Sequence, residues 1–317
     1  MTGRPSAGWG RLPVRSIALI VATVVALYGF VLFRGESGDF ARALGGMRPG
    51  VWGQVIALSC LSYLARFYRW HRFLTALGHS VPVLADLRIY LAGFALTLTP
   101  AKAGETIRSL YLRPLGVPVP DSLAVFVCER LVDLLVVGGI SCLALRAFPA
   151  YAWMGLVGLG CCVLLALCLR FLAVPALVGR LFGKSLGAHL EQAAQPMRML
   201  LAPKRLAAAL PPSLTAWLAQ GLSLYLVVGA LGSPVDPGSV IGIYCVAILA
   251  GALSFLPGGL GATEGAIVFL LISTGIPAAD AVVASLLARG LTLWLAVAIG
   301  LGATAMLAAA APASNAG

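Results

Sequence analysis

Long apolar runs constrain this chain more than any other feature. A membrane-spanning helix needs about 20 consecutive apolar residues. Six runs are suited to spanning: residues 16–33, 51–67, 121–145, 150–172, 210–231 and 278–309. Only 10% of the residues are charged, whereas soluble globular chains have roughly a quarter. The sequence therefore predicts an all-α integral membrane protein with six full transmembrane helices and no soluble domain.

Basic residues predict the orientation, because loops on the cytoplasmic side of a membrane contain an excess of Lys and Arg. Residues 170–205 contain six basic residues and a single acid, Glu191, and residues 66–72, "RFYRWHR", are also basic. Both segments are expected on the cytoplasmic side. A basic segment precedes the first run, which we interpret as an uncleaved span. We expect a multi-pass protein of the cell (inner) membrane with a cytoplasmic N-terminus.

Two shorter apolar runs, residues 87–99 and 240–256, each lead into a break rich in proline and glycine, "TPAKAG" and "LPGGLGAT". Residues 87–113 are too few for two full spans, yet the chain must enter and leave this region on the same side. We therefore expect a re-entrant helical hairpin whose tip, "PAKAG", is buried. Non-helical backbone is tolerated at membrane depth where protein shelters it or where it lines a wet cavity.

A self-comparison of the chain reveals an internal repeat. From Glu105 onward, the chain aligns without a gap on the segment that begins at Glu264, an offset of 159 residues that also pairs Arg130 with Arg289. Upstream of the breaks, "ALG" and "IY" recur at an offset of 154. One span, residues 150–172, lies between the copies and turns the second copy upside down. We expect inverted repeats whose interrupted helices meet near the midplane, an architecture of membrane transporters.

The repeat divides the chain into four parts. They are residues 1–50, the first span and outer loop; residues 51–145, the first repeat; residues 146–205, the connecting span and basic cytoplasmic segment; and residues 206–310, the second, inverted repeat. The candidate hinge residues at the two breaks are Pro100, Gly104, Pro257, Gly258, Gly259 and Gly261.

Charged residues inside the apolar segments form the candidate site. Each costs about 2.5 to 3.5 kcal/mol on insertion scales, so few are kept without a partner or a task. The candidates for substrate binding are Glu105, Arg108, Arg130, Asp133, Glu264, Arg289, Glu129, Arg66 and Arg69. Glu129 and Asp133 are four residues apart on one helix face, so they should repel one another unless a cation lies between them.

Two compatible interpretations of these charges stay open. In the first, they form structural ion pairs, Glu105 with one arginine and Glu264 with another. In the second, Arg108, Arg130 and Arg289 meet an anionic headgroup in a polar cavity at mid-membrane, and phosphate matches the planar guanidinium fork. Glycines around both breaks would let the backbone approach that ligand closely.

Other chemical signatures are missing from the sequence. "GLGATEG" follows no strand, so a dinucleotide site is unsupported, and there is no P-loop for ATP. The three histidines form no metal-binding set, and no serine stands in a G-x-S-x-G elbow. The seven cysteines lie inside apolar segments, where a free cysteine packs as a small hydrophobe. We expect no metal, no cofactor and, because the net charge of +11 lies beside apolar spans, no nucleic-acid partner.

Four segments, taken in order, resemble a known family: "RFYRW", "TPAKAGETIR", "ERLVD" and "LPGGLGATEG". Together they resemble the lysylphosphatidylglycerol synthase transmembrane (flippase-like, UPF0104) integral membrane proteins over residues 51–305. The resemblance implies a translocase that moves or handles an amphiphilic membrane lipid with an anionic or glycosylated head. By position, the family motifs fall on Arg66, Arg69, Trp70, Pro100, Gly104, Glu105, Arg108, Glu129, Arg130, Asp133, Gly258, Gly261 and Glu264.

Two other functions stay open beside lipid translocation. One is a membrane enzyme that acts on a polyprenyl-phosphate lipid, with Glu105 or Asp133 as general base. The other is a non-catalytic subunit of a glycolipid or hopanoid assembly system, with lipid-biosynthesis or glycosyltransferase partners. Since no aminoacyltransferase domain accompanies the spans, we expect a transporter-like protein that does not make lysylphosphatidylglycerol.

The orientation predicts which residues can be labelled. Residues 35–50 and 233–238 are expected outside and residues 170–205 inside. In a chain without other cysteines, an impermeant maleimide applied to intact cells should therefore modify Asp236→Cys and leave Lys184→Cys unmodified. Labelling of both positions from the same side would contradict the assignment.

Overall fold

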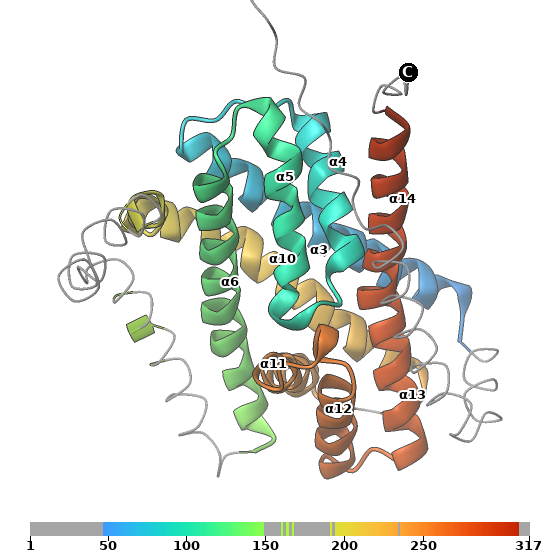
Figure 1. Ribbon diagram of the computed structural model, residues 1–317. Helices are drawn as coiled ribbons and strands as arrows, with labels where there is room; N and C mark the ends of the chain where they lie inside the picture. Colours follow the sequence, from blue (N-terminus) through green and yellow to red (C-terminus); the bar gives the residue numbers. More distant parts are fainter. Residues whose placement is uncertain are drawn as a thin grey trace, which may run out of the picture. The chain divides into compact units, whose positions relative to one another are not determined.

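The computed structural model describes residues 47–148, 160, 163–164, 167, 191, 194–233 and 235–310. All of one expected span, residues 16–33, and most of another, residues 150–172, lie outside the described residues. The chain divides into two compact units, residues 1–46 and 47–317, and the following description concerns the second. Within its described residues every regular element is a helix and there is no strand, as predicted (Figure 1).

Two helices of equal length represent the same element of the two repeats. α3 (Pro49–Ala76) and α10 (Pro203–Ala230) each contain 28 residues and begin with a proline. Proline is well tolerated in the first turn, because its missing N–H would have no partner within the helix. The bounds of the two helices differ by 154 residues at both ends, the offset of this part of the repeat. α3 and α10 also pack against one another (Figure 1).

The first hairpin lies at the break that the sequence predicted. It consists of α4 (Val83–Gly93), η1 (Phe94–Leu96), η2 (Pro100–Ile107) and α5 (Arg108–Leu112). The chain reverses direction between the 3₁₀ segments η1 and η2, so that α4 and α5 lie side by side (Figure 1). Thr99 has an extended backbone, the conformation that a following proline favours. The helical hairpin expected in residues 87–113 is thus present, and its re-entrance into the membrane stays a prediction.

The second hairpin has the same design with a tip rich in glycine. It consists of α11 (Pro237–Leu253), η6 (Pro257–Gly259) and α12 (Ala262–Ser273). Gly258, Gly259 and Gly261 all have positive φ, which glycine adopts without the strain that a Cβ would bring. A Cβ on Gly258 would lie only 3.0 Å from the side chain of Leu98. The two hairpin tips therefore contact one another, as predicted (Figure 1).

Each hairpin is followed by a long helix. α6 (Val119–Ser141) continues as η4 (Cys142–Arg146), and α13 (Ala278–Arg289) continues through the π-helical turn η7 (Gly290–Trp294) into α14 (Leu295–Ala310). Both begin directly after a proline, Pro118 or Pro277, and these prolines are again one repeat apart. Asp121 lies in the first turn of α6.

The π-helical turn is bonded to α3. Such turns leave carbonyl groups without their usual partners in the helix. In η7 the carbonyls of Leu291 and Thr292 accept hydrogen bonds from the hydroxyls of Ser59 and Tyr63. These bonds satisfy buried backbone groups and attach the second half to α3.

The two halves are interleaved. In the first half, α4 and η1 pack against α14 of the second half, whereas α11 of the second half packs against α6 and η4 of the first. A Cβ on Gly300 would overlap with the backbone of Ala95, and a Cβ on Gly242 would overlap with the backbone of Ala144. Helices of the opposite half therefore fix the position of each hairpin.

The spanning prediction is confirmed in part. Two helices, α10 and the continuous helix of residues 278–309, are long and apolar enough to cross a membrane. α3 and α6 lie at predicted spans and contain 28 and 23 residues, but they include several charged ones. Arg66 and Arg69, which we counted in a cytoplasmic loop, are buried within α3, and only Arg72 of that segment's arginines is exposed. The orientation argument for this segment was therefore wrong in treating all three as loop residues.

Gly300 and Gly302 of α14 form a matched pair that tests the packing of the halves. A side chain at Gly300 would meet the backbone of η1, whereas nothing lies within 4 Å of a Cβ on Gly302. We expect Gly300→Leu to destabilise the protein by at least about 1 to 3 kcal/mol, the usual cost of overpacking. Gly302→Leu should leave the midpoint of thermal unfolding in detergent nearly unchanged. Equal midpoints for the two variants would contradict the contact.

Candidate functional site

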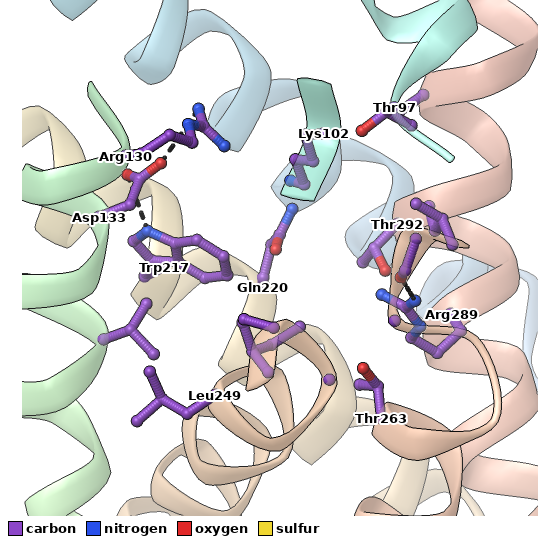
Figure 2. Close-up of a pocket in the computed structure, with 18 of the residues that line it drawn as sticks. Thr97, Lys102, Arg130, Asp133, Trp217, Gln220, Leu249, Thr263, Arg289 and Thr292 are labelled. Carbon is purple, nitrogen blue, oxygen red and sulfur yellow. Dashed lines mark hydrogen bonds and ion pairs between the residues drawn. The ribbon is translucent and has the colours of Figure 1, made fainter. Parts of the chain in front are cut away.

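A cavity of about 280 Å³ lies where the two hairpin tips meet α3, α6 and α10. Figure 2 shows polar side chains from both halves around it. Its charged lining residues are Arg66, Lys102, Arg130, Asp133 and Arg289. Its larger aliphatic lining residues are Leu134, Val137, Ile248, Leu249, Leu256 and Leu293. One cavity thus combines an excess of positive charge with an apolar wall.

Arg69 joins the two carboxylates that the sequence places on one face of α6. Its Nη2 donates to Glu129 at 3.2 Å and its Nη1 donates to Asp133 at 2.7 Å. Nη1 also donates to the hydroxyl of Ser213 on α10. Arg69, Glu129 and Asp133 are all buried. Arg69 is therefore a cation that lies between the two carboxylates and offsets their repulsion.

Arg108 links the first hairpin to the same carboxylates. Its Nη2 lies 2.9 Å from Oε2 of Glu105 and its Nη1 lies 3.6 Å from Oε2 of Glu129. The guanidinium stacks 4.0 Å from the ring centre of Tyr90, a favourable arrangement for a desolvated cation. A Cβ on Gly93 would overlap with this guanidinium. Glycine at that position is therefore needed for Arg108 to reach its partners.

Arg130 lies at the cavity wall with one carboxylate beside it. Its Nη2 is 3.2 Å from Oδ2 of Asp133, and Figure 2 marks this ion pair. Its buried Nε has no hydrogen-bond partner among the described residues. Asp133 also accepts a hydrogen bond of 3.0 Å from Nε1 of Trp217. We call the six groups Arg69, Arg108, Arg130, Glu105, Glu129 and Asp133 the ion cluster.

Arg289 holds the second tip. Its Nε donates to Oε1 of Glu264 and its Nη2 donates to the carbonyl oxygen of Gly258, both at 2.8 Å. Glu264 in turn accepts a hydrogen bond of 2.7 Å from the N–H of Gly261. Glu105 and Glu264 are therefore each paired with a buried arginine, as the sequence predicted.

Arg66 has neutral partners. Its Nη2 donates to Oε1 of Gln220 at 3.2 Å, and its guanidinium lies 4.2 Å from the ring centre of Trp217. Tyr244 donates a second hydrogen bond to the same Gln220 oxygen at 3.1 Å. Lys102 projects from the first tip into the cavity (Figure 2).

The structure separates the predicted residues into two groups. Cavity-lining candidates are Arg66, Arg130, Asp133, Arg289, Gly258 and Gly259. Candidates behind the wall, which position the others, are Arg69, Glu105, Arg108, Glu129 and Glu264. The candidate hinges Gly104, Pro257 and Gly261 lie in or beside the tips without lining the cavity, and Pro100 begins η2.

Several cavity residues were missing from the prediction: Lys102, Trp217, Gln220 and Tyr244. The repeat held a signal for two of them, because the offset of 154 pairs Gln220 with Arg66 and Tyr244 with Tyr90.

Asp86 lies outside the cavity lining. It accepts a hydrogen bond of 2.9 Å from Trp70 and is 2.7 Å from Nδ1 of His71. Across the part of the chain that the structure describes, no group of three His, Cys, Asp or Glu residues is suited to a metal ion.

Comparison with known proteins identifies relatives. The family model for the lysylphosphatidylglycerol synthase TM region matches residues 16–300. A UPF0104 membrane protein of Methanothermobacter thermautotrophicus is 28% identical over 230 residues, 65% of this chain and 69% of that protein. A UPF0104 membrane protein of Pyrococcus horikoshii is 23% identical over 279 residues, 77% of this chain and 83% of that protein. A phosphatidylglycerol lysyltransferase of Staphylococcus haemolyticus is 38% identical over 73 residues, 23% of this chain and 9% of that enzyme.

Arg69 and Arg72, one turn apart on α3, test the ion cluster. Arg69 is buried between two carboxylates and Arg72 is exposed. We expect Arg69→Met to cost about 3 to 5 kcal/mol, because it leaves buried carboxylates without their cation. Arg72→Met should cost less than about 0.5 kcal/mol. Size-exclusion profiles of the two variants after stepwise heating would show the difference, and similar melting of both would refute the structural role of Arg69.

Proposed function

Because this chain belongs to the lysylphosphatidylglycerol synthase TM region family of membrane proteins, we propose that it is a lipid translocase of the flippase-like kind. In this proposal, the headgroup of an amphiphilic membrane lipid enters the cavity between the hairpin tips. The supporting observation is the cavity itself, in which cations from both halves share one space with an aliphatic wall. An amphiphilic lipid needs both, a polar surface for its headgroup and an apolar surface for its chain.

The cations favour an anionic headgroup. Arg130 and Arg289 line the cavity while carboxylates behind them fix their orientation. A guanidinium held in this way offers a preorganised fork to phosphate. The structural and functional interpretations of the buried charges thus combine, since the ion pairs keep the arginines in place for a ligand.

The aliphatic side of the cavity suits the beginning of an acyl or prenyl chain. Leu256 lines the cavity and is 45% exposed, so the apolar wall continues from the cavity to the outside of the described unit. Leu253 and Phe255, directly before it, are 77% and 71% exposed. A chain attached to a bound headgroup could leave along these residues without crossing a polar surface.

Inverted repeats would give this site access to both sides of the membrane in turn. The contacts across the halves are reciprocal, which supports a two-fold relation between them. Tyr63 donates to the carbonyl of Thr292, and Trp217 donates to Asp133. The repeat pairs Tyr63 with Trp217 and Thr292 with Asp133. We propose that the two tips are alternate gates of one site.

The proposed substrate is a lipid of the membrane in which the protein lies, here taken as the cell membrane with the N-terminus inside. The stretch shared with an enzyme named for phosphatidylglycerol is consistent with a phosphate-containing lipid. Reconstitution into vesicles that contain a fluorescent anionic phospholipid tests the function directly. Absence of protein-dependent lipid movement for every phospholipid class would contradict it.

Arg130→Lys separates a ligand-binding role from a structural one. Lysine keeps the charge but lacks the planar guanidinium fork, including the Nε–H donor, of Arg130. We expect normal folding and roughly tenfold slower movement of an anionic lipid, which corresponds to about 1.4 kcal/mol of lost interaction. The exposed Arg113→Lys is the matched control. An unchanged rate for Arg130→Lys, together with misfolding of Arg130→Leu, would leave Arg130 with a structural role only.

A further inference from the structure

The cavity and the ion pairs around it contain two more cations than carboxylates. In the ion cluster, three arginines meet three carboxylates, and Arg289 meets Glu264. Arg66 and Lys102 also line the cavity. Among the described residues, no carboxylate oxygen lies within 4.0 Å of a side-chain nitrogen of either residue, so neither forms a salt bridge. Asp86 lies outside this group, where it accepts a hydrogen bond from Trp70 and lies 2.7 Å from Nδ1 of His71.

Lys102 occupies a backbone position that favours glycine. Its φ is 56°, and Gly261, which precedes Glu264 by three residues as Lys102 precedes Glu105, has a φ of 82°. A side chain strains the backbone in this left-handed region, and such strain is common at functional sites. The second half uses glycine here, while the first half keeps a lysine whose side chain points into the cavity (Figure 2). The lysine is therefore better explained by its charge than by the turn.

Arg66 also differs from its repeat counterpart by its charge. The repeat pairs Arg66 with Gln220, the neutral residue to which it donates a hydrogen bond of 3.2 Å. The side chain is buried, its Nε has no hydrogen-bond partner in the part of the chain that the structure describes, and the guanidinium lies over Trp217. Both cations without a carboxylate thus belong to the first half and face the same cavity.

We propose that the headgroup is a phosphate monoester with two negative charges, and that Arg66 and Lys102 bind the second charge. This inference rests on the lipid function proposed above. A phosphate monoester has a charge of about −1.5 to −2 near neutral pH, whereas a diester has a single negative charge. The doubly charged head balances both cations in a site where an uncompensated charge is costly. A diester would leave one of them without a counter-charge.

Two synthetic lipids that differ by one methyl group test the proposal. Dioleoyl phosphatidic acid is a monoester, and dioleoyl phosphatidylmethanol is the matching diester. Their binding to the purified full chain is measured by native mass spectrometry at about pH 8, above the second pKa of a phosphate monoester, about 6. We expect the monoester to bind roughly tenfold to a hundredfold more tightly, the range of a charged hydrogen bond. The preference should shrink as the pH falls toward that second pKa.

Lys102→Gly is the informative variant, because the second half already has glycine at the paired position and the turn is then unstrained. It should fold and lose the preference for the monoester over the diester. Lys102→Met, which keeps most of the stem, should do the same, and the exposed Arg113→Met should retain the preference. Retention of the full preference by both Lys102 variants would overturn the role of Lys102.

The remaining outcomes separate this inference from the function on which it rests. Equal, saturable binding of monoester and diester by the unchanged protein would overturn the doubly charged headgroup and leave the lipid function in place. Binding of neither lipid would refute the lipid function itself. Displacement of the lipid by equimolar inorganic phosphate would show that the site takes a soluble anion, which also contradicts a lipid headgroup.

Discussion

The ion cluster around Arg69 is the interaction on which the rest of the structure depends. It joins α3, the first hairpin and α6, and Ser213 and Trp217 extend it to α10. Removing one partner from a buried pair costs several kcal/mol, because the other charge is left without compensation. The four elements therefore assemble as one unit, and the cavity is the space that remains beside it.

The sequence predicted the helices, the two breaks and the pairing of both glutamates with arginines, because charges are rare in apolar segments and the repeat fixes their spacing. It could not predict which arginine meets Glu105. The repeat suggests Arg130, the counterpart of Arg289, yet Glu105 meets Arg108. Arg108 is only one turn away from Glu105. Arg130 instead forms an ion pair with Asp133, and the second half has no equivalent pair because the counterpart of Asp133 is the uncharged Thr292.

Composition did not reveal the uncharged part of the cavity, although the repeat pairs Gln220 with Arg66 and Tyr244 with Tyr90. Trp217, Gln220 and Tyr244 stand in apolar segments where aromatic and amide side chains are common, so composition does not mark them. Their position follows from the packing of α10 on α3 and α11, a tertiary arrangement that periodicity does not fix. Lys102 was visible at the break, but only the backbone conformation distinguishes it from an ordinary turn residue.

The two tips are held in different ways, and this difference bears on how binding could be coupled to movement. The first tip is bonded to α6 through Arg108, behind the cavity wall. The second tip is bonded to α13 through Arg289, which lines the cavity and donates to the carbonyl of Gly258 in the tip itself. An anionic headgroup that accepts a hydrogen bond from Arg289 would compete with that carbonyl for the guanidinium. A ligand shifts a conformational equilibrium only through such differential contacts, so Arg289 is where an anion in the cavity would act on the second tip.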